Sequence, residues 1–210
     1  MVNTIGVTGG IGSGKSLACR YLEQCGAHIF AADQVARDLM ERDTELRRAV
    51  RAAFGEKSYL AEGTLNRPWL AQRVFGDADA LKRLSDIAHP AVRRAFKDVR
   101  AACTVPLLVH EAALIFESGA DQQLGAVVVI TAPLELRLSR VMTRDNVTQA
   151  QVLARLQHQW PTEVLEKRAD VVVTNEGTPV ALKAKMRLIF ALATAVTPLT
   201  RAAFKENQRL

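Results

Sequence analysis

The chain has 210 residues, of which 49% are hydrophobic, and a formal net charge of +6. It is long enough for one large domain or one core with insertions, and it lacks the run of about 18 apolar residues that a membrane-spanning helix needs. Basic residues are interspersed with acidic ones, so we expect no nucleic-acid partner. An apolar strand starts directly after the N-terminus and leaves no room for a signal peptide, which predicts a cytoplasmic location and reduced cysteines.

Five apolar runs with the length of β-strands occur along the chain, at residues 3–8, 27–30, 105–110, 125–131 and 170–174. The third and fourth runs are continuous rather than alternating, which is typical of strands buried on both faces of a parallel sheet. Helix-forming segments separate the runs. This order predicts an α/β fold with a doubly wound, five-stranded parallel sheet.

A glycine-rich stretch follows the first run. Residues 9–16 read Gly-Gly-Ile-Gly-Ser-Gly-Lys-Ser, which matches the phosphate-binding pattern G-x-x-x-x-G-K-[ST]. Glycines let the backbone turn its N–H groups toward a triphosphate, while Lys15 offers a charge to the β/γ-phosphates and Ser16 a hydroxyl to Mg²⁺. The pattern therefore predicts a P-loop kinase-like nucleotide site, against the alternative of a plain glycine-rich turn. Its expected residues are Gly10, Ile11, Gly12, Ser13, Gly14, Lys15, Ser16 and Leu17.

Two carboxylates follow predicted strands. Asp33 comes directly after the second run, at the sheet edge where strands of an α/β fold line the ligand crevice. There it is placed to accept the proton of an acceptor hydroxyl or to hold a magnesium-bound water, although a helix N-cap before Gln34 is an equally simple interpretation. Glu111 ends the third run and is a candidate to act on Mg²⁺ through water.

Two long segments do not fit simple crossover helices. The segment 33–103 must hold several helices, and 133–168 is also charged and helical. In a P-loop enzyme such insertions hold the second substrate and exclude water during transfer, whereas the alternative is that they only pack. We therefore expect a nucleotide-binding core (1–32, 104–136 and 169–196), a substrate-binding insertion (33–103) and a lid (137–168). Residues 197–210 form a polar tail that is a candidate for partial disorder.

Three arginines in the expected lid are spaced to share one helix face. Arg137, Arg140 and Arg144 stand at i, i+3 and i+7. Guanidinium groups match phosphate oxygens in pairs, so we expect Arg140 or Arg144 to contact phosphate, against the alternative of a solvated basic face. The lone histidines His28, His110 and His158 are interpreted as structural or exposed.

With these residues in hand, the chain resembles the dephospho-CoA kinase family from Ile5 to about Gly177. Each motif is short, but their joint presence in order is specific. The matching segments are Thr8–Ser16, Ala31–Arg37, Leu65–Arg67, Val74–Phe75, Ile87–Val92, Ala113–Ser118, Arg140–Asp145 and Ala169–Gly177.

The resemblance implies that ATP, with Mg²⁺, phosphorylates the ribose 3′-hydroxyl of dephospho-CoA to give coenzyme A and ADP. It also implies a helical CoA-binding insertion and a lid. Asp33 would activate the acceptor, and Lys15 and Arg140 would complete the catalytic set. Arg144, Asn175 and Gly177 would join the ATP-binding residues, and the dephospho-CoA contacts would be Arg37, Asn66, Arg67, His89 and Phe116.

The chain departs from the family pattern at two positions. Ala31 replaces the first aspartate of a D-A-D segment, and Ala113 replaces a proline, while Glu111 stands where many relatives have aspartate. If the residue at position 31 helps to hold Mg²⁺ in the family, Glu111 or water must substitute here.

Two other functions remain open on the sequence. A kinase of the same fold that acts on a nucleoside monophosphate or another small metabolite is the nearest, and Leu65–Arg67 with His89-Pro90 speak against it. A non-enzymatic nucleotide switch is the other. Asp33 and the expected lid arginines speak against a switch, which would instead need a water-positioning residue and loops that partners recognise, and the sequence shows no clear signature of these.

Overall fold

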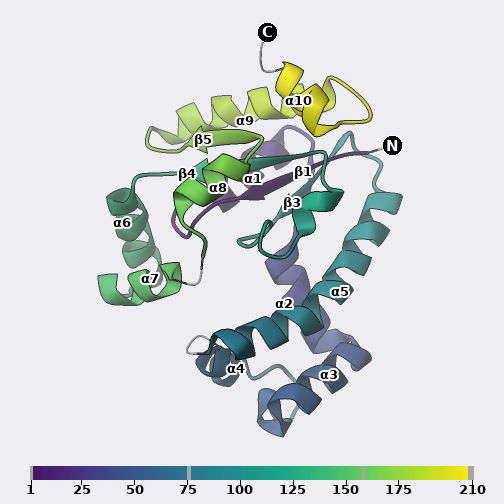
Figure 1. Ribbon diagram of the computed structural model, residues 1–210, viewed down its shortest axis with the longest axis vertical. Coiled ribbons are helices and arrows are strands. Elements are labelled where there is room, and N and C mark those ends of the chain that lie inside the picture. Colours follow the sequence, from purple (N-terminus) through teal and green to yellow (C-terminus); the bar gives the residue numbers. More distant parts are fainter. Residues whose placement is uncertain (1, 75–76, 158, 208–210) are drawn as a thin grey trace. The chain divides into compact units, whose positions relative to one another are not determined.

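The computed structural model describes residues 2–74, 77–157 and 159–207, so Phe75, His158 and the last three residues lie outside the described part. The chain divides into two compact units (Figure 1). The first comprises residues 1–31 and 102–210 and contains the sheet, and the second comprises residues 32–101 and is helical. Among the described helices, none combines the length and apolarity that crossing a bilayer requires.

The first unit is built on a five-stranded sheet whose strands are all parallel, in the order β2-β3-β1-β4-β5. The predicted α/β fold with a parallel sheet is thereby confirmed, and every strand lies within two residues of its predicted position. The strands are β1 (Asn3–Thr8), β2 (His28–Ala31), β3 (Leu107–Glu111), β4 (Ala126–Thr131) and β5 (Val171–Thr174).

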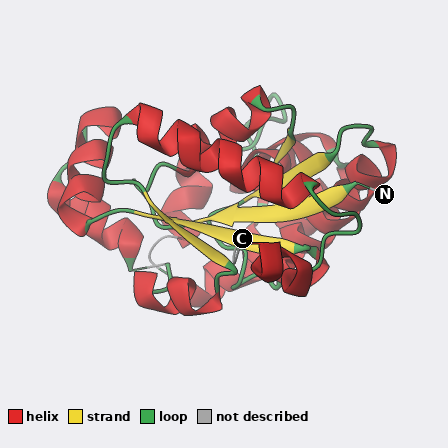
Figure 2. Ribbon diagram, turned by 90° about the horizontal axis from the view of Figure 1, so that it is seen from above, coloured by secondary structure: helices red, strands yellow, loops and turns green. Residues whose placement is uncertain are grey.

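Helices flank the sheet on both sides (Figure 2). Those of the first unit are α1 (Lys15–Gln24), α6 (Leu134–Asp145), α7 (Gln149–Leu156), α8 (Thr162–Arg168), α9 (Pro179–Thr194) and α10 (Arg201–Asn207), with a short 3₁₀ helix η2 (Ala120–Gln123). The second unit consists of its own helices, α2 (Ala32–Arg42), α3 (Thr44–Phe54), α4 (Arg67–Val74) and α5 (Ala78–Ala102), with a 3₁₀ helix η1 (Glu56–Ser58).

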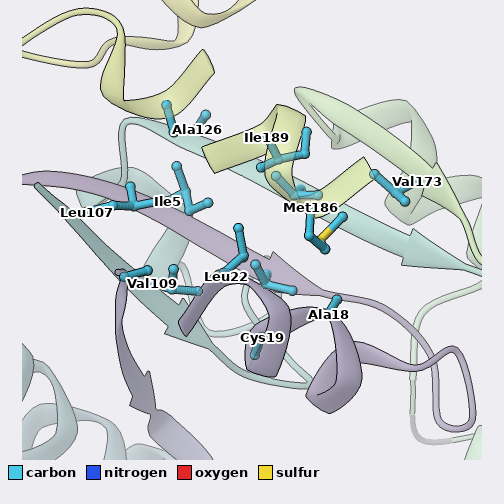
Figure 3. Close-up of a cluster of buried hydrophobic side chains, with 14 of the residues drawn as sticks. Ile5, Ala18, Cys19, Leu22, Leu107, Val109, Ala126, Val173, Met186 and Ile189 are labelled. Carbon is cyan, nitrogen blue, oxygen red and sulfur yellow. The ribbon is translucent and has the colours of Figure 1, made fainter. Parts of the chain in front are cut away.

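The main core of the first unit lies between one face of the sheet and helices α1 and α9 (Figure 3). Alternate residues of β1, such as Ile5 and Val7, point into it and are fully buried. Leu22 of α1 and Met186 of α9 meet them from the helical side. Cys19 is part of this cluster as a free thiol, and burial raises its pKa, so it behaves as a small apolar residue.

The second unit has its own core around Tyr59. The ring is buried, its hydroxyl donates to the Met40 carbonyl over 2.7 Å, and the guanidinium groups of Arg47 and Arg51 lie 5.3 and 5.0 Å from the ring centroid. Apolar side chains from α2, α3, α4 and α5 surround it, among them Val50 and Leu70. A separate cluster of this size is what lets residues 32–101 form a compact unit.

The C-terminal segment, whose composition makes it a candidate for partial disorder, is described as far as Asn207 and contains helix α10. Helix α10 brings Phe204 fully into the main core, and Leu199 is also buried there. Asn3 of β1 holds the preceding turn: its side-chain amide donates to the Ala193 carbonyl, and its oxygen accepts from the Leu199 N–H over 2.9 Å. Two apolar side chains and the buried amide of Asn3 thus attach this largely polar segment to the main core.

Of the histidines interpreted as structural or exposed, His28 is exposed and His110 is buried in β3. The His110 ring lies 5.3 Å from the ring of Phe30, centroid to centroid. Burial lowers the pKa of His110 to about 4, because the imidazolium form loses its hydration.

We predict that His110 makes the fold sensitive to acid. The unfolded chain takes up a proton at this residue below about pH 6.5, whereas the folded chain does so only near pH 4, so stability falls as the pH drops across this window. The His110→Phe variant keeps an aromatic ring against Phe30 and should lose up to about 3 kcal/mol of that pH dependence. Urea unfolding of both proteins between pH 7 and pH 4 measures it, and parallel pH profiles would contradict the assignment.

Candidate active site

The loop that joins β1 to α1 has a backbone that only glycine adopts easily. Gly14 precedes the first helical residue with φ 97° and ψ 22°, in the left-handed region. At Gly9, a Cβ atom would overlap the carbonyl oxygen of Ile130 in β4. These glycines therefore set the path of the loop, and helix α1 begins at its end with its N-terminal N–H groups facing an incoming anion.

Lys15 and Ser16, the two side chains predicted to meet the phosphates and the metal, lie at the first turn of α1. The Lys15 ammonium donates to the Gly9 carbonyl over 2.9 Å, across the mouth of the loop. The Ser16 hydroxyl donates to a carboxylate oxygen of Glu111 over 3.2 Å. A hydroxyl and a carboxylate are both oxygen ligands of the kind that Mg²⁺ takes, so these two residues suit a magnesium site.

Asn175 supports the loop from the end of β5. Its side-chain amide is buried and donates to the Ser13 carbonyl over 2.8 Å, and its backbone N–H donates to Thr131 over 2.7 Å. The Asn175 amide thus stabilises the loop backbone beside Gly14, where a Cβ atom would overlap it. Gly177, which the family resemblance also implies as an ATP-binding residue, is exposed in the turn before α9.

Helix α6 carries the three arginines, and they lie in three different environments. Arg137 is buried, and it donates to the Ile11 carbonyl through Nε and to the Thr162 hydroxyl through Nη1, each over 3.0 Å. Arg140 is half-buried, and its Nη1 is shielded from solvent without a hydrogen-bond partner among the described residues. The side chain of Arg144 is 63% exposed. The three arginines therefore lie on one helix, as their spacing predicts, but their side chains differ in burial and in hydrogen-bond partners.

Asp145 connects two arginines at the end of α6. Its carboxylate accepts from Arg144 over 2.7 Å and from Arg155 of α7 over 2.8 Å. These hydrogen bonds, above all that from Arg144, lower the pKa of Asp145 to about 2. In this structure Arg144 is thus paired with its neighbour, and a phosphate would have to compete with Asp145 for it.

In the second unit, three of the predicted residues lie on α2 and α5. Asp33 is exposed in the first turn of α2, inside the helix rather than as its cap, where a negative charge also suits the helix dipole. His89 of α5 is close enough for the charge of Asp33 to act on it; its pKa is nonetheless lowered, first by burial and then by Arg93. Arg37, one turn after Asp33, donates to Gln34 over 2.8 Å.

The other predicted substrate contacts have structural partners here. Asn66 caps α4 by accepting from the Trp69 N–H, and its amide donates to the Lys57 carbonyl over 3.1 Å. Arg67 pairs with Glu41 over 2.8 Å while its side chain stays 50% exposed. Phe116, in the loop after β3 of the first unit, is buried.

Two residues between α7 and α8 make contacts that no sequence pattern predicts. Gln159 accepts from the Ile11 N–H through its side-chain oxygen over 2.8 Å, and the Trp160 N–H donates to Glu117 over 3.4 Å. Gln159 and Trp160 belong to none of the recognised motifs, and only the three-dimensional structure brings Gln159 to the phosphate-binding loop and Trp160 to Glu117 in the segment after β3. Burial raises the pKa of Glu117, because the charged carboxylate loses hydration.

A parallel sheet of this strand order, with a glycine-rich loop between its central strand and the first helix, defines a P-loop nucleotide-binding protein of the kinase type. The family model described as dephospho-CoA kinase matches residues 3–180. The chain is also 43% identical over 196 residues to a dephospho-CoA kinase from Salinibacter ruber, which covers 92% of this chain and 98% of that protein. The chain belongs to the dephospho-CoA kinase family.

Solved structures agree with this assignment. A protein from Thermus thermophilus is 34% identical with a TM-score of 0.78, and the match covers 90% of this chain and 97% of that one. A dephospho-CoA kinase from Campylobacter jejuni is 28% identical with a TM-score of 0.66, covering 93% and 98% of the two chains.

Proposed function

We propose that this protein transfers the γ-phosphoryl group of ATP to the ribose 3′-hydroxyl of dephospho-CoA, giving coenzyme A and ADP. The observation that carries the proposal is the P-loop with Lys15 and Ser16 at the start of α1, facing Glu111, in a chain of the dephospho-CoA kinase family. Phosphoryl transfer needs positioning and charge compensation more than covalent chemistry, and a loop of this kind supplies both.

The nucleotide end of the reaction belongs to the loop and α1. Lys15 would exchange its contact with the Gly9 carbonyl for the β- and γ-phosphates, whose charge it compensates. Ser16 would hold Mg²⁺, with Glu111 and Asp33 acting on it through water. When bound, the ion neutralises charge on the β- and γ-phosphate oxygens.

The acceptor end belongs to Asp33. Its carboxylate would take the proton of the 3′-hydroxyl as that oxygen attacks the γ-phosphorus atom, so that the proton leaves the acceptor when the new P–O bond forms. Exposure in the first turn of α2 leaves this carboxylate accessible to a substrate. Arg37 and His89, from the same unit, would contact dephospho-CoA, as would Asn66, Arg67 and Phe116.

Arg140 would stabilise the charge on the transferred group. A guanidinium nitrogen that is shielded from solvent and lacks a protein partner in the described part of the chain is costly, and phosphate oxygens would satisfy it. Arg144 would support it once released from Asp145. Residues 137–168 would then close over the nucleotide as a lid.

The first test is release of ADP from Mg-ATP with and without dephospho-CoA, with the 3′-phosphate of the product checked by mass spectrometry. We expect ADP release to depend strongly on dephospho-CoA, and Lys15→Ala to abolish it because the β/γ-phosphate charge is then uncompensated. Stimulation by a nucleoside monophosphate in its place would indicate a different kinase, and ADP release that ignores every acceptor would indicate a nucleotide switch.

Asp33→Asn should lower kcat by about 10²- to 10⁴-fold while Mg-ADP binding stays at the wild-type level, since the amide cannot take up the acceptor proton. Steady-state rates and calorimetric titration with Mg-ADP give the two numbers. Asp38→Asn, five residues further along α2, is the matched control and should keep full activity. If the Asp33→Asn enzyme were as fast as the wild type, Asp33 would not take up the acceptor proton, and its role would be limited to its favourable charge at the start of α2.

Arg140→Ala should lower kcat more than it weakens Mg-ATP binding, because the contact is expected to strengthen as charge builds up on the transferred group. Arg140→Lys keeps the charge without the planar fork and should recover only part of the rate. If instead only the KM for Mg-ATP rises and kcat is unchanged, Arg140 binds ATP as strongly in the ground state as in the transition state.

A further inference from the structure

Ile11, at the tip of the phosphate-binding loop, is held at three points by residues that follow β4. Its N–H donates to Gln159 over 2.8 Å, and its carbonyl accepts from Arg137 over 3.0 Å. Its side chain packs against the cluster of Leu138, Val141 and Val152 from α6 and α7. Both peptide groups and the side chain of one loop residue are thus engaged by the same segment of the chain.

Helix α6 also lies directly against the neighbouring glycines. A Cβ atom at Gly10 would overlap the guanidinium of Arg137, and one at Gly12 would lie 2.6 Å from the Arg137 carbonyl oxygen. Arg137 is buried, and burial lowers its pKa, so its hydrogen bonds to Ile11 and Thr162 have to compensate the lost hydration. A buried guanidinium with these partners fixes the distance between the loop and the starts of α6 and α8.

Such a loop would otherwise be costly to order. Gly9, Gly10, Gly12 and Gly14 give it more conformational freedom than any other residue type would, and binding a nucleotide would have to remove that freedom. Contacts that order the loop beforehand lower this cost and so increase nucleotide affinity.

We propose that Ile11 joins the phosphate-binding loop to α6 and α7, and that Arg137, Gln159 and the apolar cluster around Ile11 act as positioning residues for nucleotide binding. We call this set the Ile11 clamp. The inference rests on the proposed nucleotide-binding role of the loop and extends it to residues outside the P-loop pattern. Because the coupling is reciprocal, nucleotide in the loop also stabilises the position of α6 and α7, which carry Arg140 and Arg144.

Gln159→Ala tests the clamp at its most exposed contact, with Gln157→Ala as the matched control, because Gln157 is exposed at the end of α7. Calorimetry with Mg-ADP should show affinity weakened by about 3- to 10-fold in Gln159→Ala and unchanged in Gln157→Ala. The KM for Mg-ATP should rise in parallel, whereas the KM for dephospho-CoA should not.

Ile11→Ala tests the apolar contact, because it leaves every backbone group of the loop in place. It should weaken Mg-ADP binding, and Ile11→Val, which keeps most of the packing, should restore it. Thermal unfolding of each variant establishes that it is folded; if Ile11→Ala is not, Gln159→Ala alone decides.

Wild-type Mg-ADP affinity in a folded Gln159→Ala variant, or equal weakening in Gln157→Ala, would overturn the clamp while leaving the proposed function intact. A wild-type protein that binds no Mg-ADP would overturn both.

Discussion

The backbone of the β1–α1 loop has to meet two opposed requirements. Most of its peptide N–H groups must stay available to a highly charged ligand, which is why so many of its residues are glycine. The same glycines leave the loop without side chains of its own to hold it in place. The surrounding protein must therefore fix the loop from outside, and much of the first unit can be understood as doing so.

Several elements contribute a contact each. Asn175, just after β5, donates a hydrogen bond to the Ser13 carbonyl. The N–H of Ile11 donates to Gln159, which precedes α8, and the carbonyl of Ile11 accepts from Arg137 of α6. Ile130 of β4 leaves no room for a side chain at Gly9. These contacts come from parts of the chain more than a hundred residues away from the loop, so the parallel sheet, which brings strand ends to one edge, is what makes the site possible.

The difference between local sequence patterns and contacts from distant parts of the chain explains how much could be predicted from the sequence. The strands and the loop were predicted because each depends on local pattern: continuous apolar runs for the former, glycine spacing for the latter. The three arginines of α6 show where the sequence is not enough. They are the same residue type on one helix face, yet Arg137 is buried against the loop, Arg140 is half-buried and Arg144 pairs with Asp145. The three arginines differ in how deeply they are buried, and the spacing of residues along a helix does not reveal their burial.

Gln159 could not be predicted at all, because a single glutamine between two helices has no pattern. The C-terminal segment shows that a polar composition can conceal contacts with the core. Leu199 and Phe204 were enough to bring it into the core, since one fully buried aromatic side chain contributes about 1.5–3 kcal/mol.

The departure at Ala31 can be judged from the register of the sheet. Ala31 of β2 lies directly opposite Glu111 of β3, so the side chains at the two positions share one face at the end of adjacent parallel strands. An aspartate at position 31, as in the family pattern, would place two carboxylates side by side, where like charges raise the pKa of one of them. Because position 31 is alanine here, Glu111 is the one carboxylate of this pair of positions, and it accepts a hydrogen bond from the Ser16 hydroxyl. Mg²⁺ at a nucleotide site takes most of its ligands from phosphate and water, so a single carboxylate at this edge is compatible with the proposed chemistry.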